Sequence, residues 1–332
     1  MFICNYPDFA PISLVQQDEI RPMLLSTVDG ISEFTFSNLY LFRARYQYRV
    51  AVVPNGGLII SGTTPPAYAK TPALETAALE KAALEKADSS SNRTQFFMTP
   101  CGFPGFDILE SLFKTHAYWK NIPPALLETA SGSTTLYAQL EKWGIEILED
   151  RDNFDYLYLR EELAALSGKR FHKKKNLVNA FMNAYPDHEQ RPLDLRLIHD
   201  AQAVLERWRE GKGEDGDYFA TKEALEHFSV FNLQGAIYYI GGKPAAFCLG
   251  ESVANGSMFT IHFEKALEQY KGIYQYMNQA FAASLSPAFT YINREQDLGS
   301  EGLRQAKMTY RPVGYIKKYR GILTTKQHEQ EK

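Results

Sequence analysis

An alternating segment, residues 258–264, carries the side chains best suited to acid–base chemistry. Successive side chains of a strand point to opposite faces, so the pattern predicts His262 and Glu264 on one face and the apolar residues on the other. Either group could remove a proton from an incoming amine, which must be neutral to act as a nucleophile. The structural alternative is that Glu264 pairs with Lys265 or a nearby arginine and that His262 is packed in the core.

A tyrosine at the end of a later helix is a candidate proton donor. The spacing predicts a short helix over residues 303–310, closed by Pro312, with Tyr310 on one stripe with Lys307. The phenol could protonate a leaving thiolate or ribose hydroxyl. The alternative is a tyrosine at a helix end with its ring in the core.

Charged residues also follow a predicted strand, residues 289–293. Ligands bind at the carboxyl ends of the strands in open α/β sheets, so this loop is a candidate substrate site. Carboxylates there could hold an amino group or a cationic side chain, and an arginine could hold a carboxylate or phosphate. The alternative is a solvated charged turn. The predicted substrate-binding residues are Asn293, Arg294, Glu295, Asp297, Arg304 and Lys307.

Two basic stretches stand out against a formal net charge of −3. They could form an electropositive surface for a tRNA acceptor arm, a nucleotide-bearing donor or anionic lipid head groups. Solvated helix faces are the alternative. The first stretch contains Lys169, Arg170, Lys173, Lys174 and Lys175, and the second contains Arg304, Lys307, Arg311, Lys317, Lys318 and Arg320.

These residues need a scaffold that brings them together. The pattern from residue 257 to residue 315 predicts a strand, a glycine-containing turn at residues 268–272, a helix over residues 273–284, a second strand and a short helix. Such a unit can hold a phosphorylated ligand at a helix N-terminus. The remaining chain mixes strands and helices, which predicts an α/β (α+β) fold with helices on both faces of mixed, twisted sheets.

Two halves of the chain repeat one order of elements. Hairpin turns with Gly56-Gly57 and Gly241-Gly242 open the two copies, and Gly144 and Gly314, each before an apolar residue, close them. We therefore predict two copies of one fold, at residues 1–160 and 161–325, with a polar tail at residues 326–332. Strands are expected at residues 34–40 and at residues 145–148 paired with 154–159, and a helix is expected to begin at Thr71.

The totals exclude several classes of protein. A chain of 332 residues with 45% hydrophobic and 23% charged residues suits two globular domains. Its 3 cysteines, with no CxxC pair, indicate a reducing compartment and no metal site or disulfide framework. Residues 1–8 do not resemble a secretory signal, and no apolar run of about 18 residues predicts a membrane span. The expected location is the cytoplasm.

The passage Ala306-Lys-Met-Thr-Tyr310-Arg-Pro-Val-Gly314-Tyr315 resembles the closing motif of the GNAT acyltransferase superfamily, in which an alanine, a tyrosine and a Gly-aromatic pair recur at this spacing. Residues 269–274 resemble that superfamily's pyrophosphate loop, Gln/Arg-x-x-Gly-x-Gly/Ala. Tyr274 departs from it by replacing a small residue. The resemblance implies that the cofactor-binding residues are Gln269, Lys271, Gly272 and Tyr274.

Nearly the whole chain is similar to the bacterial family related to the transferase domain of lysyl-phosphatidylglycerol synthases. The segments that carry this similarity are residues 32–40, 169–176 and 293–304. The resemblance implies tandem GNAT-like domains with acyl or aminoacyl transfer as their chemistry. The first half has Leu140 in place of the tyrosine and no Gln-x-x-Gly turn, so the donor site is expected in the second half and a structural or acceptor-binding role in the first.

The sequence thus predicts an acyl- or aminoacyltransferase with Glu264, His262 and Tyr310 as catalytic candidates. No tightly bound cofactor or metal is expected; an aminoacyl-tRNA or an acyl-CoA would be the co-substrate, and an amine or hydroxyl of a small molecule or lipid the acceptor. Two alternatives stay open: a non-catalytic binding module on the same fold, and a peripheral binder of anionic lipid or phosphate. The acceptor and the oligomeric state do not follow from the sequence.

Overall fold

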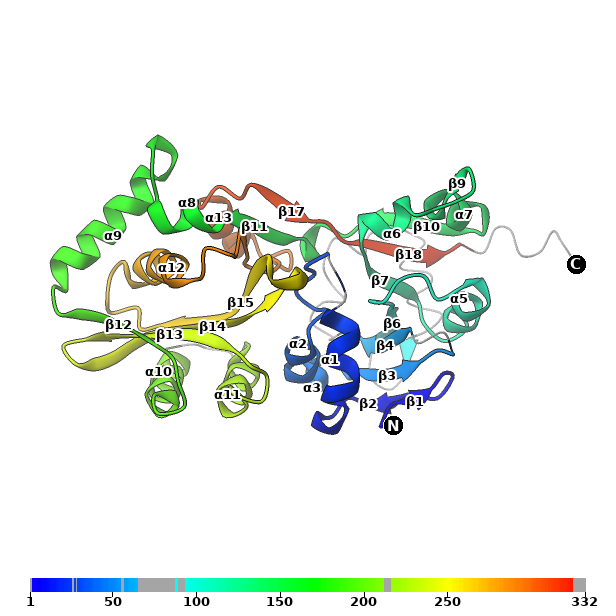
Figure 1. Cartoon of the computed structure of the whole chain (residues 1–332), viewed down its shortest axis with the longest axis horizontal. Coiled ribbons are helices and arrows are strands. Elements are labelled where there is room, and N and C mark those ends of the chain that lie inside the picture. The colour runs from blue at the N-terminus through cyan, green and yellow to red at the C-terminus, as the bar shows by residue number, and fades with distance from the viewer. Residues whose placement is uncertain are drawn as a thin grey trace, which may run out of the picture. The chain divides into compact units, whose positions relative to one another are not determined.

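The chain forms two compact units (Figure 1). The computed structural model describes residues 2–25, 27, 29–54, 57–64, 87–88, 93–211 and 216–324. The first unit comprises Met1–Phe154, Gln296–Gly299 and Ile316–Lys332, and the second comprises Asp155–Glu295 and Ser300–Tyr315. The helix predicted from Thr71 and the polar tail at residues 326–332 lie outside the described residues.

The first unit is built on a mixed sheet in the order β1-β3-β4-β6-β7-β18-β10, with β2 beside β3 and β5 beside β6. Strand β4 is antiparallel to β3 and β6, whereas β6 is parallel to β7. The strands are β1 (Cys4–Asn5), β2 (Ala10–Pro11), β3 (Arg49–Val52), β4 (Leu58–Thr63), β5 (Ala87–Asp88), β6 (Arg93–Met98), β7 (Tyr118–Ile122), β10 (Ile145–Glu149) and β18 (Tyr319–Leu323), and a separate pair is β8 (Ala130–Ser131) with β9 (Thr134–Thr135).

Helices cover this sheet and bury its apolar face. They are α1 (Gln17–Leu25), α2 (Phe36–Leu41), α3 (Arg43–Tyr46), α5 (Phe106–Phe113), α6 (Pro124–Glu128) and α7 (Leu136–Lys142). Leu112 of α5 and Leu140 of α7 pack with Phe97 and Trp119 of the sheet in one buried cluster. The Phe97 and Trp119 rings stack with centroids 6.0 Å apart, so the core is aromatic as well as aliphatic.

The second unit has a mixed sheet in the order β12-β13-β14-β15-β16-β11-β17. Strands β13, β14 and β15 are joined antiparallel, and β15 is parallel to β16. The strands are β11 (Asp155–Leu159), β12 (His188–Pro192), β13 (Gln234–Ile240), β14 (Lys243–Val253), β15 (Met258–Ala266), β16 (Tyr291–Asn293) and β17 (Gly314–Ile316).

Helices lie on both faces of this second sheet, with α12 on one face and α10 and α11 on the other (Figure 1). Phe259 of β15 packs edge-on against Phe281 of α12, with ring centroids 5.5 Å apart. Phe259 and Ile261 of the alternating segment thus belong to the buried core under α12. The helices are α8 (Arg160–Ala165), α9 (His172–Ala184), α10 (Ile198–Glu210), α11 (Tyr218–Glu226), α12 (Ile273–Ser284) and α13 (Glu301–Met308).

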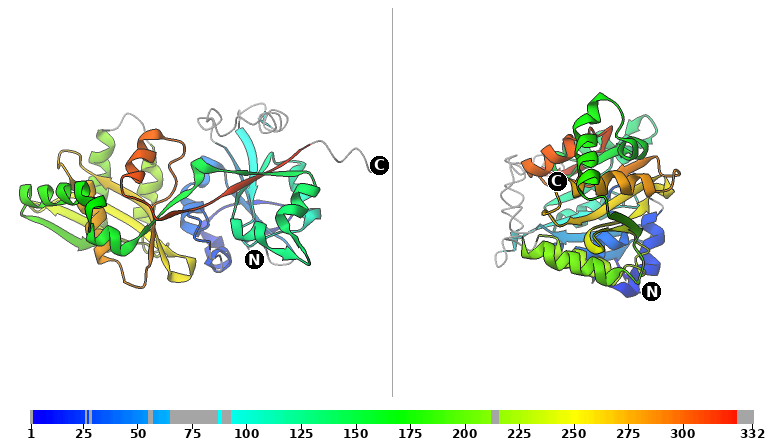
Figure 2. Two further views of the ribbon diagram at one scale, coloured as in Figure 1. Left: turned by 90° about the horizontal axis from the view of Figure 1, so that it is seen from above. Right: turned by 90° about the vertical axis from the view of Figure 1, so that its left-hand side faces the viewer.

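Each sheet contains one strand that comes directly after a strand of the other unit in the sequence. Strand β18 follows β17 of the second unit but is inserted between β7 and β10 of the first, as the red segment in Figure 2 shows. Strand β11 follows β10 of the first unit but lies between β16 and β17 of the second. The predicted contiguous halves, 1–160 and 161–325, therefore differ from the observed units at both strand exchanges.

The exchange also makes the predicted pairing of residues 145–148 with 154–159 wrong. Strand β10 pairs with β18, and β11 pairs with β16. Buried Asp150, between β10 and β11, is held by two hydrogen bonds from Arg320 of β18, so the chain turns there without closing a hairpin.

A second prediction is also wrong. Part of the expected strand at residues 34–40 is the helix α2, because Thr35 caps a helix by accepting a hydrogen bond from the Asn38 amide.

The two sheets confirm the predicted duplication and the mixed, helix-flanked fold class. Both have an antiparallel hairpin, a third antiparallel strand, a strand parallel to it, an exchanged strand and a closing strand, in the same order. Gly144 and Gly314 stand before or at the start of the closing strands β10 and β17. In the described part of the chain, no helix has the length and apolar character needed to cross a membrane.

Candidate active site

The site forms where two parallel strands of the second unit separate. Strand β15 pairs with β16 only through Met258, Phe259 and Thr260 and then continues to Ala266. Beyond this point β15 stays paired with β14 on one side, and on the other side it no longer has a strand neighbour. A β-bulge at His262 interrupts the predicted alternation, because Leu249 pairs with Phe263 and Gly250 with Ile261. Glu264 accordingly bonds to Asn278 of α12, the helix that Phe259 also contacts. Both His262 and Glu264 still meet the residues after Asn293.

His262 is clamped between two carboxylates. Its Nδ1 lies 2.7 Å from Glu295 Oε1 and its Nε2 lies 3.0 Å from Glu251 Oε1, and its side chain is 1% exposed. Burial alone would lower the pKa of His262, but the bonds to the two carboxylates outweigh it and raise the pKa to about 10. At neutral pH, the ring is thus an imidazolium that donates from both nitrogens and has no lone pair for another proton.

Glu264 is paired with the arginine that follows β16. Its carboxylate lies 2.5 Å from the Arg294 guanidinium and accepts from Asn278 Nδ2 at 2.7 Å. Burial opposes the charge of Arg294, but Glu264 raises the pKa of this guanidinium further above its usual value. The structure thus contains the ion pair that the sequence offered as the alternative to a general-base role for Glu264.

Two cations lie against the ring of Tyr310. Lys174 Nζ is 4.0 Å and the Arg294 guanidinium carbon is 5.0 Å from the ring centroid. Burial raises the pKa of Tyr310 to about 12, although Arg294 lowers it in part. Among the described residues, none bonds to the Tyr310 hydroxyl, although the residue is only 6% exposed. This phenol therefore carries a proton at neutral pH and no protein partner.

Lys307, a second lysine of this cluster, stabilises the backbone that follows β16. Lys307 Nζ donates to the carbonyl oxygens of Arg294 at 2.7 Å and Glu295 at 3.0 Å, and Tyr158 donates to the Lys307 carbonyl at 2.8 Å. Glu295 has a φ of 55°, a conformation that non-glycine residues seldom adopt. The lysine thus helps to hold the strained segment that presents Glu295 to His262. Burial lowers the pKa of Lys307 to about 8, and Arg294 adds to this while Glu295 opposes it.

The glycine turn before α12 is closed by a neighbouring helix. Gly272 has a φ of 91°, and a Cβ there would lie 3.0 Å from the carbonyl oxygen of Leu177 and 3.2 Å from Cβ of Phe181, both on α9. The Tyr274 hydroxyl lies 3.4 Å from the Ala266 carbonyl oxygen, and the ring packs against the core. Gln269 and Lys271, the other two cofactor-binding candidates, are exposed.

The other predicted residues lie in several different environments. Asn293 is buried and donates to Asp155 at 3.1 Å while accepting from the Glu295 amide at 2.7 Å, so it supports the site. Asp297 belongs to the first unit, where it accepts from the Gly299 amide at 2.9 Å. Arg304 is partly buried on α13. On the exposed side are Lys169, Arg170, Lys173 and Lys175, of which Arg170 pairs with Glu162.

Sequence reasoning missed four residues of the cluster: Glu251, Asn278, Tyr158 and Asp155. Each lies on an element other than the loop after β16 and reaches the site through non-local contacts. Only Glu251 left a signal, a carboxylate that directly follows the apolar stretch of strand β14, residues 244–250. A buried charge needs a partner, so this position pointed to an ion pair without naming it.

Comparisons with known proteins agree with this geometry. The family described as "Phosphatidylglycerol lysyltransferase, C-terminal" matches residues 73–321. A crystal structure of a conserved protein of unknown function from Bacteroides thetaiotaomicron VPI-5482 is 28% identical, with a TM-score of 0.74, and the match covers 95% of this chain and 99% of that one. The C-terminal domain of a putative lysylphosphatidylglycerol synthetase from Agrobacterium fabrum is 12% identical, with a TM-score of 0.57, over 94% of this chain and 91% of that one.

The match to a curated relative is shorter, and it spans less than two thirds of that protein's length. The uncharacterized protein MYCGA3080 of Mycoplasmoides gallisepticum is 25% identical over 186 residues, which are 54% of this chain and 58% of that protein. The family match spans most of the sequence, including every residue of the cluster around Tyr310. The chain belongs to the family of phosphatidylglycerol lysyltransferase C-terminal domains, and its two units have the GNAT-like acyl- or aminoacyltransferase fold.

Proposed function

We propose that this chain transfers an aminoacyl group from an aminoacyl-tRNA to an amine or hydroxyl acceptor, at the cluster around Tyr310. The observation that carries the proposal is the hydroxyl of buried Tyr310, which no described residue bonds, between Lys174 and Arg294. The ring is buried, but the hydroxyl is not one of the fully buried polar atoms that lack a partner, so it is open to solvent and available to a ligand. The family description, a lysyltransferase, supports aminoacyl chemistry.

The closed glycine turn favours tRNA over coenzyme A as the donor. A coenzyme A pyrophosphate needs close approach to the backbone amides at a helix N-terminus. At Gly272, α9 already lies where even a Cβ would be crowded, and Tyr274 occupies the position of a small residue. An aminoacyl-tRNA places its ester at the end of a long single strand and does not need this turn.

The transfer requires one proton to leave the acceptor and one to reach the leaving group. The acceptor attacks the ester carbonyl carbon, the bond to the ribose oxygen breaks, and Tyr310 donates its proton to that oxygen. The neutral form of Lys174 is suited to take the acceptor's proton, and this form is accessible near neutral pH because burial, with Arg294, lowers the pKa of the lysine to about 8. His262 is protonated between its two carboxylates and therefore positions Glu295 and Glu251 instead of acting as a base.

The test is a transfer assay with tRNA charged with one radioactive amino acid at a time. Label is expected to leave the acid-insoluble RNA and to appear in an aqueous product for a small-molecule acceptor, or in the organic phase for a lipid. Tyr310→Phe is expected to slow transfer by about 10²-fold, the usual loss for a proton donor. Tyr315→Phe, the same substitution on β17, is the matched control and is expected to keep the rate.

Two outcomes would contradict the proposal. Consumption of acetyl-CoA without any use of aminoacyl-tRNA would overturn the choice of donor. Binding of charged tRNA without transfer to an added amine, an alcohol or phospholipid vesicles would favour the non-catalytic binding module. A rate that is equal in Tyr310→Phe and Tyr315→Phe would remove Tyr310 from the mechanism.

The exposed side of α9 supports a second candidate function, binding of a polyanion without catalysis. Lys173 and Lys175 are exposed there, next to Leu177 and Met182, which are 36% and 42% exposed. Phosphate contacts make binding depend on salt, so the double variant Lys173→Ala/Lys175→Ala is expected to weaken tRNA binding and to reduce its salt dependence. Pelleting with phosphatidylglycerol vesicles, with no binding of tRNA, would favour a lipid surface as the polyanion.

A further inference from the structure

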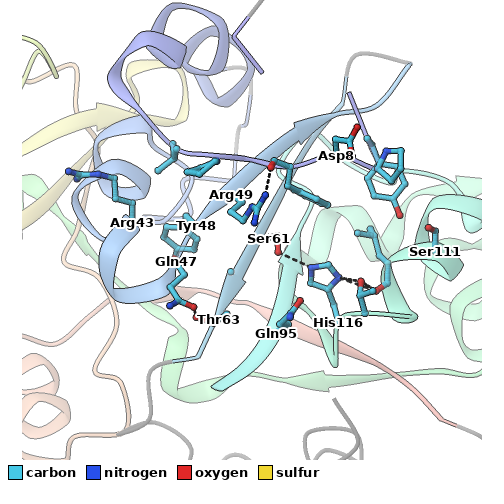
Figure 3. Close-up of a pocket in the computed structure, with 18 of the residues that line it drawn as sticks. Asp8, Arg43, Gln47, Tyr48, Arg49, Ser61, Thr63, Gln95, Ser111 and His116 are labelled. Atoms are coloured by element: carbon cyan, nitrogen blue, oxygen red, sulfur yellow. Dashed lines mark hydrogen bonds between the residues drawn. The ribbon is translucent and has the colours of Figure 1, made fainter. Parts of the chain in front are cut away.

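The first unit contains a pocket of about 940 Å³, a volume typical of small-molecule sites. Its wall is formed by the N-terminal segment, by strands β3 and β4, and by the end of α5. Figure 3 shows Ser61 and His116 meeting in this wall, with Gln95 beside them. All of these residues belong to the first unit, so the inference drawn from this pocket is independent of the transfer proposed above.

Ser61 and His116 have the geometry of a nucleophile and its base. Ser61 Oγ lies 2.8 Å from His116 Nε2, within the range of about 2.6–3.2 Å that such pairs adopt. His116 is 4% exposed and contacts the rings of Phe9 and Phe97, with centroids 6.2 and 5.7 Å away. The imidazole is thus fixed in its orientation, as a base that must meet a nucleophile needs to be.

The partners of the other ring nitrogen, Nδ1, determine which nitrogen of His116 carries the hydrogen. His116 Nδ1 lies 3.0 Å from the carbonyl oxygen of Leu112 and 2.9 Å from Thr115 Oγ1. A carbonyl oxygen only accepts, so Nδ1 of the neutral ring carries the hydrogen and Nε2 carries the lone pair. The Ser61 hydroxyl therefore donates to Nε2. The Leu112 carbonyl holds the tautomer, as a carboxylate does in a Ser-His-Asp triad.

A third side chain can polarise a carbonyl group at this point. Register pairs Ser61 with Phe97 and Thr63 with Gln95, so Gln95 lies on the neighbouring strand β6, on the same face as Ser61. In the described part of the chain, the Gln95 side chain has no hydrogen-bond partner. Its amide N–H is thus available to a developing oxyanion.

We infer that Ser61 is a nucleophile that takes an acyl group from a carboxylic ester or thioester bound in this pocket. The Ser61 oxygen attacks the carbonyl carbon, and its proton passes to His116 Nε2. The carbon–oxygen or carbon–sulfur bond of the substrate breaks, and the leaving alcohol or thiol takes that proton. Water then attacks the acyl-serine with the same nitrogen as base, which releases the carboxylic acid and restores Ser61.

The pocket lining indicates which esters fit. Tyr6, Phe9 and Ile12 give it an apolar side, which suits a carbon chain. Arg49 lies at the wall and donates to the Phe9 carbonyl oxygen at 2.5 Å. The lining contains two arginines, Arg43 and Arg49, but a single carboxylate, Asp8, and this excess of positive charge favours an acyl chain with an anionic end.

The test exposes the whole chain to a fluorophosphonate, whose phosphorus is attacked by an activated serine with loss of fluoride. A single adduct on Ser61 is expected by peptide mass spectrometry. Ser61→Ala should abolish the adduct, and Gln95→Leu should slow its formation about 10-fold. Ser111→Ala, a serine of the same pocket, is the matched control and should label at the wild-type rate. Tyr310→Phe should also label normally, which separates this site from the transfer site.

Hydrolysis of 4-nitrophenyl acetate and 4-nitrophenyl hemisuccinate gives a second readout, with faster release expected from the anionic ester. His116→Gln should slow both reactions at least about 10²-fold, and its thermal melting is compared with that of the wild type because the histidine is buried. Wild-type protein left unlabelled while a known serine hydrolase reacts fully would overturn the inference. So would an adduct on another residue, or equal labelling of Ser61→Ala.

Discussion

In the first unit the buried charges join an exchanged strand to its sheet, whereas in the second they surround a tyrosine with an unbonded hydroxyl. Lys318, directly before β18, and Arg320 of β18 pair with Glu33 and Asp150, residues 285 and 170 positions away in the sequence. The cluster around Tyr310 comes mainly from residues 251–310, plus Asp155, Tyr158 and Lys174. One fold thus uses paired buried charge for assembly in one copy and leaves a polar group unpaired in the other, which is where we place chemistry.

The largest effect is expected from breaking the pair in the first unit. Lys318 and Glu33 have side chains 0% and 5% exposed, and although burial alone would raise the pKa of Glu33, Lys318 and Lys120 hold it below its usual value. Lys318→Met leaves this carboxylate buried with less compensation, which should lower the free energy of unfolding by about 3–5 kcal/mol in a urea titration.

Lys317→Met is the matched control, because this neighbouring lysine pairs with Glu149 at the surface and its side chain is 48% exposed. It is expected to leave the urea midpoint unchanged. Adding Glu33→Gln to Lys318→Met should recover part of the stability, since the unpaired charge is then removed. Equal midpoints for the two lysine variants would show that the buried pair does not hold the exchanged strand.

A pH-dependent effect of about 2–4 kcal/mol is expected in the second unit. The pKa of His262 is about 10 in the folded chain, above its ordinary value, so its contribution to stability is complete below pH 6.5 and is lost as the pH rises through 10. The measurement is the difference in unfolding free energy between wild type and His262→Gln, at pH values from 6.5 to 10.

Comparison with the variant cancels the contributions of Lys174 and Lys307, whose lowered pKa values act in the opposite direction over this range. The groups facing His262 are Glu251 and Glu295, and both remain in the variant. The difference should shrink as the pH rises. A difference that stays constant to pH 10 would contradict the imidazolium between two carboxylates.

The smallest expected effect is a difference in stability between two glycine variants, one in the turn before α5 of the first unit and one in the turn before α12 of the second. Gly102 has a φ of 114° and no atom within 4 Å of the place that a Cβ would take, whereas a Cβ at Gly272 would crowd α9. Both changes to alanine carry a backbone cost of about 1–2 kcal/mol, and Gly272→Ala should cost about 1–3 kcal/mol more because of overpacking. Urea titrations of the two variants measure this difference, and equal losses would show that the turn at Gly272 is open.

Local patterns predicted much of the fold. Alternation located strand β15, although a β-bulge at His262 interrupts its two-residue period, and glycine pairs located the hairpins of both copies. Residues 34–40 misled because their aromatic and apolar side chains suit a buried strand and a buried helix equally, and the Thr35 cap decides for the helix. The candidate site was predicted in part: Glu264, Arg294 and Tyr310 come together, whereas Asp297 lies in the other unit.

The sequence by itself determined the duplicated α/β architecture, the strand that carries His262 and the short helix that precedes Tyr310, because side-chain periodicity and glycine turns act over a few residues. Only the tertiary structure decided which strands pair, that β11 and β18 change units, that α9 closes the turn at Gly272, and that Ser61 meets His116. These contacts join residues far apart in the sequence, and their free energies depend on burial and on partners that no local pattern specifies.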